Sequence, residues 1–180
     1  ASYSPTAIGT ETDGSITSPS AACCLVGIKP TVGLVGRSGI IPISHSQDTA
    51  RPMARSVRDA AIVLAVLTGI DPRDEATRAG AGRASADYTR FLDADGLKGA
   101  RIGVVGERYM GYSPKTDRLV EDALTLFRKS GSTVVDPANI ATAGKFDDAE
   151  FEVLLHEFKA DMAKYLGALG SAASFRSLAD

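Results

Sequence analysis

The stretch from Gly9 to Ser20 holds the residue types that acyl transfer needs. Ser15 follows Gly14 in a run of small or hydrogen-bonding residues, Gly-Thr-Glu-Thr-Asp-Gly-Ser. Apolar Ala7-Ile8 predicts a short strand that leads into this run, and Gly14 can adopt a positive φ without steric cost. We therefore expect a tight turn in which backbone N–H groups converge beside the Ser15 hydroxyl, giving a nucleophile and donors for an oxyanion. By itself, a Gly-Ser pair in a polar turn is more typical of an ordinary loop.

The blocks that follow give the turn a context. The chain carries Gly9–Ser20, Val26–Gly33, Ser38–Pro42, Ser46–Thr49 and Pro52–Ala61 in that order. These blocks resemble the amidase signature family in order and spacing, most closely its bacterial peptide-amidase-like branch, which shares Glu-Thr-Asp-Gly-Ser. The resemblance is strong over the first third of the chain, and the remainder is similar to the family's variable middle.

The resemblance implies a hydrolase of carboxylic amides that needs no metal and no cofactor. It implies Ser15 as the nucleophile, and the backbone amides of Thr12, Asp13, Gly14 and Ser15 as the oxyanion hole. In the family, a second Ser relays the proton to a Lys, and both lie upstream of the Gly-Thr-Glu block. The 180 residues contain neither the Gly-Gly-Ser-Ser-Gly-Gly run nor the Lys strand. We therefore expect residues 1–180 to be an internal fragment of a single amidase signature domain and to be inactive alone.

Other residues near these blocks offer alternatives for the base. Lys29 lies in a Lys-Pro-Thr segment that is structural in the resembling family, so we do not assign it as the base. A triad of Ser15, His45 and Asp48 is a further possibility, although the family uses no His for this task. We interpret Asp48 as a residue that orders the loop beneath the nucleophile through bonds to backbone and hydroxyl groups.

Three residues depart from the family pattern close to the site. Thr17 stands where Arg is frequent in the family. Asp13 stands where many members have Gly, and its carboxylate is expected to point away from the oxyanion. Arg51 occupies a position that is usually Gly, which predicts an altered loop near the site.

Composition limits the other function classes. The chain has 44% hydrophobic and 23% charged residues and a net charge of −2, as ordinary globular domains do. We expect no nucleic-acid partner, because there is no polybasic patch, and no membrane span, because no apolar run is long enough. Cys23 and Cys24 are adjacent in an apolar segment, which predicts small buried side chains rather than a redox or metal role. Their unpaired thiols suit a cytoplasmic origin.

The elements expected in the first part of the chain form the signature core, residues 1–70. Ser18 and Pro19 predict the N-cap and first turn of a helix ending near Cys24, and residues 25–28 a strand. Residues 31–55 show no strong period and predict a long loop. Ser56-Val57-Arg58-Asp59 has the form of a capping box for a helix to about Leu67. Residues 71–98 predict a surface excursion anchored by Phe91-Leu92.

Residues 99–180 predict a βαβ unit and a long helix. The expected strands are Arg101–Val105 and Thr133–Val135, with a helix between them that begins at Ser113-Pro114. We therefore expect an α/β fold, part of the amidase signature fold, with a mostly parallel mixed sheet flanked by helices. The long helix begins near Asp147, with His156 at a core edge or on the surface. Its solvated face is expected to hold Glu152, Glu157, Lys159, Asp161 and Lys164.

These observations favour an amide hydrolase acting through an acyl-serine intermediate on a small-molecule or peptide amide. Two alternatives stay open: a non-catalytic binding or assembly module, and an amidotransferase A-type subunit. Strand edges left open by a truncation further predict self-association.

Overall fold

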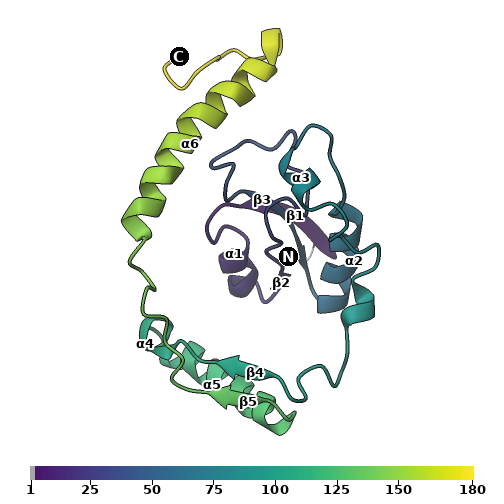
Figure 1. Ribbon diagram of the computed structural model, residues 1–180, viewed down its shortest axis with the longest axis vertical. Coiled ribbons are helices and arrows are strands. Elements are labelled where there is room, and N and C mark those ends of the chain that lie inside the picture. Colours follow the sequence, from purple (N-terminus) through teal and green to yellow (C-terminus); the bar gives the residue numbers. More distant parts are fainter. Residues whose placement is uncertain (1–2) are drawn as a thin grey trace. The chain divides into compact units, whose positions relative to one another are not determined.

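The computed structural model describes residues 3–180, apart from the side chain of Ala172, and divides into two compact units (Figure 1). The first comprises Ala1–Phe91 and Ala149–Asp180, and the second comprises Leu92–Asp148.

The first unit contains a three-stranded antiparallel sheet in the order β1-β3-β2. Its strands are β1 (Thr6–Glu11), β2 (Val26–Gly27) and β3 (Thr49–Ala54). The strand at β1 confirms the expectation from Ala7-Ile8, whereas β3 lies in the segment expected to be a loop. β3 is the central strand, although it contains Pro52, a residue that argues against a central strand. Thr49, the first residue of β3, is paired with Glu11, the last residue of β1. The turn that carries Ser15 therefore leaves β1 opposite the start of β3.

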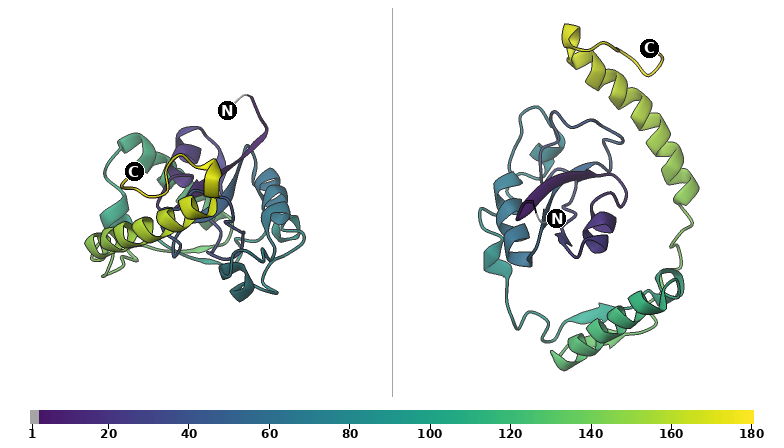
Figure 2. Two further views of the ribbon diagram at one scale, coloured as in Figure 1. Left: turned by 90° about the horizontal axis from the view of Figure 1, so that it is seen from above. Right: turned by 180° about the vertical axis from the view of Figure 1, so that it is seen from behind.

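Two helices flank these strands, α1 (Thr17–Ala22) and α2 (Val57–Leu67), as Figures 1 and 2 show. The start of α2 confirms the predicted capping box, because Ser56 Oγ accepts a bond from the Asp59 amide at 3.1 Å. The predicted start of α1 is wrong. Ile16 occupies the N-cap without a side-chain bond, and the Ser18 amide donates to the Gly14 carbonyl at 2.9 Å. The helix thus grows directly out of the Gly14 turn.

Small side chains bring α2 close to β3. Ala50, Ala54, Ala60 and Ala61 are all buried, and Val35 and Leu64 complete the apolar core beside them. Tyr88 packs against this core. The expected anchor is wrong, because the side chains of Phe91 and Leu92 are 60% and 42% exposed. The segment after α2 also forms two short helices, α3 (Ala76–Ala79) and η1 (Thr89–Phe91).

The second unit confirms the predicted strand, helix and strand. β4 (Arg101–Gly103) and β5 (Thr133–Val135) pair in parallel, and α5 (Pro114–Lys129) connects them. Ser113 caps α5 by accepting a bond from the Thr116 amide, and α4 (Gly106–Tyr109) is a short helix after β4. The chain has a mixed α/β fold, as expected. The expectation of a mostly parallel sheet is wrong for the described strands, because three of them form an antiparallel sheet and two form a separate parallel pair.

The long predicted helix is α6 (Asp147–Ala168), and η2 (Gly170–Ala172) follows it. His156 is exposed on α6, in agreement with a surface position. Within the described residues, no helix is both long and apolar enough to cross a membrane.

Candidate active site

The turn between β1 and α1 presents Ser15 to solvent. Gly14 has a φ of +79°, and a Cβ built there would meet nothing within 4 Å. The glycine is therefore required by the backbone conformation and not by crowding. Ser15 and Asp13 are exposed, whereas Thr12 is buried. The hydroxyl expected to be the nucleophile thus lies at an accessible surface, and the Asp13 side chain is exposed to solvent.

The carboxylate of Glu11 holds this turn from beneath. Its two oxygens accept bonds from the amides of Gly14 at 2.9 Å, Ile16 at 2.8 Å and Thr17 at 2.9 Å. These amides lie on both sides of Ser15, so one buried side chain fixes the backbone before and after the hydroxyl. No sequence pattern had marked Glu11 for this role.

Arg51 is the nearer of two cations beside Glu11; the other, Lys29, is half-exposed, and its Nζ lies 4.0 Å from Glu11 Oε1. Arg51 Nη1 lies 2.7 Å from Glu11 Oε2, and the side chains of Arg51 and Glu11 are buried, at 0% and 2% exposure. Arg51 Nε also donates to Thr49 Oγ1 at 2.6 Å. Burial alone would raise the pKa of Glu11, but bonds from the Thr17, Ile16 and Gly14 amides, together with Arg51, lower it to about 2. Arg51, which departs from the family pattern, therefore neutralises the carboxylate beneath the turn.

Thr12 is held from two further directions. Its hydroxyl donates to Asp48 Oδ1, and its carbonyl accepts a bond from Lys29 Nζ at 2.9 Å. Asp48 Oδ2 accepts bonds from the amides of Ile43 at 2.8 Å and Ser44 at 2.9 Å. Asp48 orders this loop as expected, and the ammonium of Lys29 is engaged by backbone.

The four amides expected to form the oxyanion hole differ in their bonding. The Gly14 amide is bonded to Glu11. Within residues 3–180, the amides of Thr12, Asp13 and Ser15 donate to no acceptor. The turn therefore offers unpaired donors next to an exposed hydroxyl.

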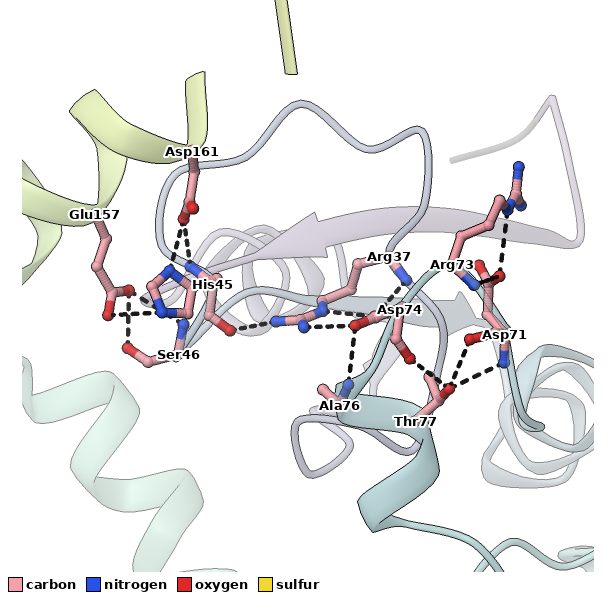
Figure 3. Close-up of polar contacts among 10 residues, drawn as sticks. All are labelled: Arg37, His45, Ser46, Asp71, Arg73, Asp74, Ala76, Thr77, Glu157 and Asp161. Carbon is pink, nitrogen blue, oxygen red and sulfur yellow. Dashed lines mark hydrogen bonds and ion pairs between the residues drawn. The ribbon is translucent and has the colours of Figure 1, made fainter. Parts of the chain in front are cut away.

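His45 is not joined to Ser15 and Asp48 in a triad. Its Nδ1 lies 2.9 Å from Asp161 Oδ2, and its Nε2 lies 3.4 Å from Glu157 Oε1, as Figure 3 shows. Both carboxylates belong to α6, so their assignment to a purely solvated face is wrong. Asp48 instead bonds Thr12 and the loop backbone. It therefore does not orient His45 as the base of the alternative triad.

The His45, Glu157 and Asp161 cluster also has the residue types of a metal site. The imidazole, however, presents a different ring nitrogen to each carboxylate. One ligand atom from each residue lies within 4.8 Å of the other two, and the carboxylates are already engaged by His45 and by the serine hydroxyls. Glu157 also bonds the hydroxyls of Ser44 and Ser46, and these bonds together lower its pKa despite its burial. The cluster is therefore a polar contact between α6 and the 44–46 loop.

A cavity of about 300 Å³ adjoins this loop. Asp48, Ile40 and Tyr165 contribute to its lining. Arg37, also in the wall, donates to both oxygens of the buried Asp74 at 2.8 Å, and these bonds outweigh burial and lower the pKa of Asp74. Because Asp48 both lines the cavity and bonds Thr12, the cavity wall is linked to the Ser15 turn.

The expected burial of the cysteines is wrong, since Cys23 and Cys24 are exposed free thiols. Cys24 has a φ of 54° and ends the turn after α1, so the apolar segment reaches the surface there.

The chain matches the amidase family, by its family profile, over residues 1–180. The chain belongs to the amidase family. It is 40% identical over 178 residues to a probable amidase of Arabidopsis thaliana, covering 96% of this chain and 33% of that protein. It is 44% identical over 137 residues to the A-type polypeptide of glutamyl-tRNA(Gln) amidotransferase from Nitrosomonas eutropha, covering 76% of this chain and 27% of that polypeptide.

Among solved structures, the native peptide amidase of Stenotrophomonas maltophilia superposes with a TM-score of 0.87 and 47% identity. The match covers 98% of this chain and 35% of that amidase. The chain thus spans about one third of the length of these amidase-family proteins, and the family membership agrees with the resemblance seen in its sequence blocks.

Proposed function

We propose that the protein carrying this chain hydrolyses carboxylic amides through an acyl ester on Ser15. The observation that carries the proposal is the exposed Ser15 hydroxyl, in a turn whose backbone Glu11 fixes on both sides. Membership of the amidase family supports the reaction class.

In this mechanism, Ser15 Oγ attacks the amide carbonyl carbon and loses its proton to a base. The new oxyanion is stabilised by backbone amides of the Thr12–Ser15 turn, of which Thr12, Asp13 and Ser15 are unpaired within the described residues. The C–N bond then breaks, the amine leaves with a proton, and water hydrolyses the acyl ester.

The base is proposed to be a Lys acting through a relay Ser, both supplied by sequence outside these 180 residues. A missing general base typically costs about 10²–10⁴-fold in rate. We therefore expect the 180 residues alone to hydrolyse no amide at a measurable rate.

For the substrate, we propose the amide of a peptide. The match to the solved peptide amidase covers 98% of the chain at 47% identity. An amidotransferase component that takes ammonia from glutamine is the second candidate, because the 44% identity to that polypeptide is close to the 47% identity to the peptide amidase.

The test uses the full-length protein and measures ammonia release from a peptide C-terminal amide and from glutamine. Ser15→Ala should abolish release, while Ser18→Ala, an exposed serine on α1, should retain it. Activity on the peptide amide supports the first proposal, and activity on glutamine alone supports the second. Full activity of Ser15→Ala would remove the proposed nucleophile.

A further inference from the structure

We propose that Arg51 is a positioning residue for this reaction: its buried guanidinium fixes the Glu11 carboxylate that shapes the Ser15 turn. The inference rests on the proposed function and adds to it a residue that touches neither Ser15 nor the proposed oxyanion donors.

The contacts around Glu11 leave little freedom to its side chain. Oε1 accepts the Gly14 amide, and Oε2 accepts the Ile16 and Thr17 amides while lying 2.7 Å from Arg51 Nη1. The Thr17 hydroxyl adds a weaker bond to Oε1 at 3.4 Å. These hydrogen bonds occupy about the four lone-pair sites that a carboxylate offers, and Arg51 adds an ion pair. Water cannot replace any of them, because the side chain is 2% exposed.

Arg51 is fixed in turn by β3. Its Nε donates to Thr49 Oγ1, and its Nη2 donates to the Glu11 carbonyl at 3.4 Å. In the β1–β3 ladder Arg51 is paired with Gly9 and Glu11 with Thr49, so Arg51 and Glu11 are diagonal neighbours on one face of the sheet. The guanidinium therefore joins the central strand to the first residue of the turn, through both the side chain and the backbone of Glu11.

The charges explain why Arg51 matters to the geometry. Every partner of the Glu11 carboxylate is a donor, so only the ionised form satisfies them all. A buried ion that loses its partner is strongly disfavoured. Without Arg51, Glu11 would take up a proton or turn toward solvent, and either change would release the amides on both sides of Ser15.

That displacement should be felt in the transition state. The oxyanion donors belong to the same turn, and a misplacement of about 1 Å can cost about 10²-fold in rate. The oxyanion exists only after Ser15 attacks the carbonyl, so the effect should fall on kcat and spare KM.

The experiment compares Arg51→Met with Arg51→Lys in the full-length protein. Arg108→Met is the matched control, because Arg108 forms an exposed ion pair with Asp147 at 2.8 Å. Four quantities are measured: kcat, KM, inhibition by a peptide aldehyde that forms a tetrahedral adduct, and inhibition by the product acid.

We expect Arg51→Met to lower kcat by about 10–100-fold and to change KM by less than about twofold. Aldehyde inhibition should weaken in proportion to kcat, and product inhibition should stay constant. Arg51→Lys should recover part of both losses, because it restores the charge without the bond to Thr49. Unchanged kcat and aldehyde inhibition in Arg51→Met would overturn the proposal, as would equal weakening of both inhibitors.

Where Arg51→Met does not fold, the same measurements on Arg51→Lys decide the question. A selective loss of kcat and aldehyde affinity supports the proposal, and wild-type values for both overturn it. Failure here is distinguishable from failure of the proposed function, since the latter appears as full activity in Ser15→Ala.

Discussion

Replacement of Glu11 by Gln should remove a large, pH-dependent part of the stability of this protein. The pKa of Glu11 is lowered from its ordinary value of 4.5 to about 2 by three backbone amides and Arg51, against the opposing effect of burial. One pH unit corresponds to about 1.4 kcal/mol, so the ionised carboxylate contributes about 3 kcal/mol to the free energy of unfolding.

The sign follows from the direction of the shift. A carboxyl whose pKa is lowered by folding stabilises the folded state above pH 4.5, and this contribution is lost as the pH falls toward about 2. Glu11→Gln should therefore be less stable than wild type by about 3 kcal/mol near neutral pH. The gap should close in acid, where wild-type Glu11 is protonated and leaves Arg51 unpaired as the variant does.

The assay is urea unfolding of the full-length protein followed by circular dichroism, from about pH 7 to about pH 2. Glu121→Gln is the matched control, since Glu121 is exposed on α5, and it should follow wild type. The reasoning is refuted if the gap between wild type and Glu11→Gln stays constant across this range, or is absent at neutral pH.

Three further predictions test the supports of the turn and the cavity wall. Gly14→Ala should lower the free energy of unfolding by roughly 1–2 kcal/mol, because Gly14 has a φ of +79°; a thermal midpoint equal to wild type would contradict this. Asp48→Asn should cost about 1.5–3 kcal/mol through weaker acceptance of buried amide and hydroxyl donors, measured by chemical unfolding, and unchanged stability would count against it. Arg37→Met should destabilise far more than Arg73→Met in thermal melts, because Arg37 pairs with the buried Asp74 whereas Arg73 is 78% exposed; equal effects would show that burial is not decisive.

Local signals in the sequence predicted the local structure well. Ser56 and Ser113 cap their helices through their own side chains, and the Gly14 turn follows the strand that Ala7-Ile8 indicated. Each depends on residues within a few positions of one another, so a short stretch of sequence contains the cause.

Interactions between distant residues were not predictable in this way. β3 was missed because Arg51 and Pro52 interrupt the pattern of a central strand, and the strand forms because it lies between β1 and β2. The pair of Glu11 and Arg51 is separated by 40 positions, and no periodicity relates them. The same holds for His45 and Asp161, whose contact depends on where α6 lies within the first unit.

The most direct test of the central claim is to label the full-length protein with a fluorophosphonate and to map the modified residue by tandem mass spectrometry. The account predicts one adduct, on Ser15, that a competing peptide amide prevents from forming. Labelling at another residue, with Ser15 unmodified in an active preparation, would contradict it.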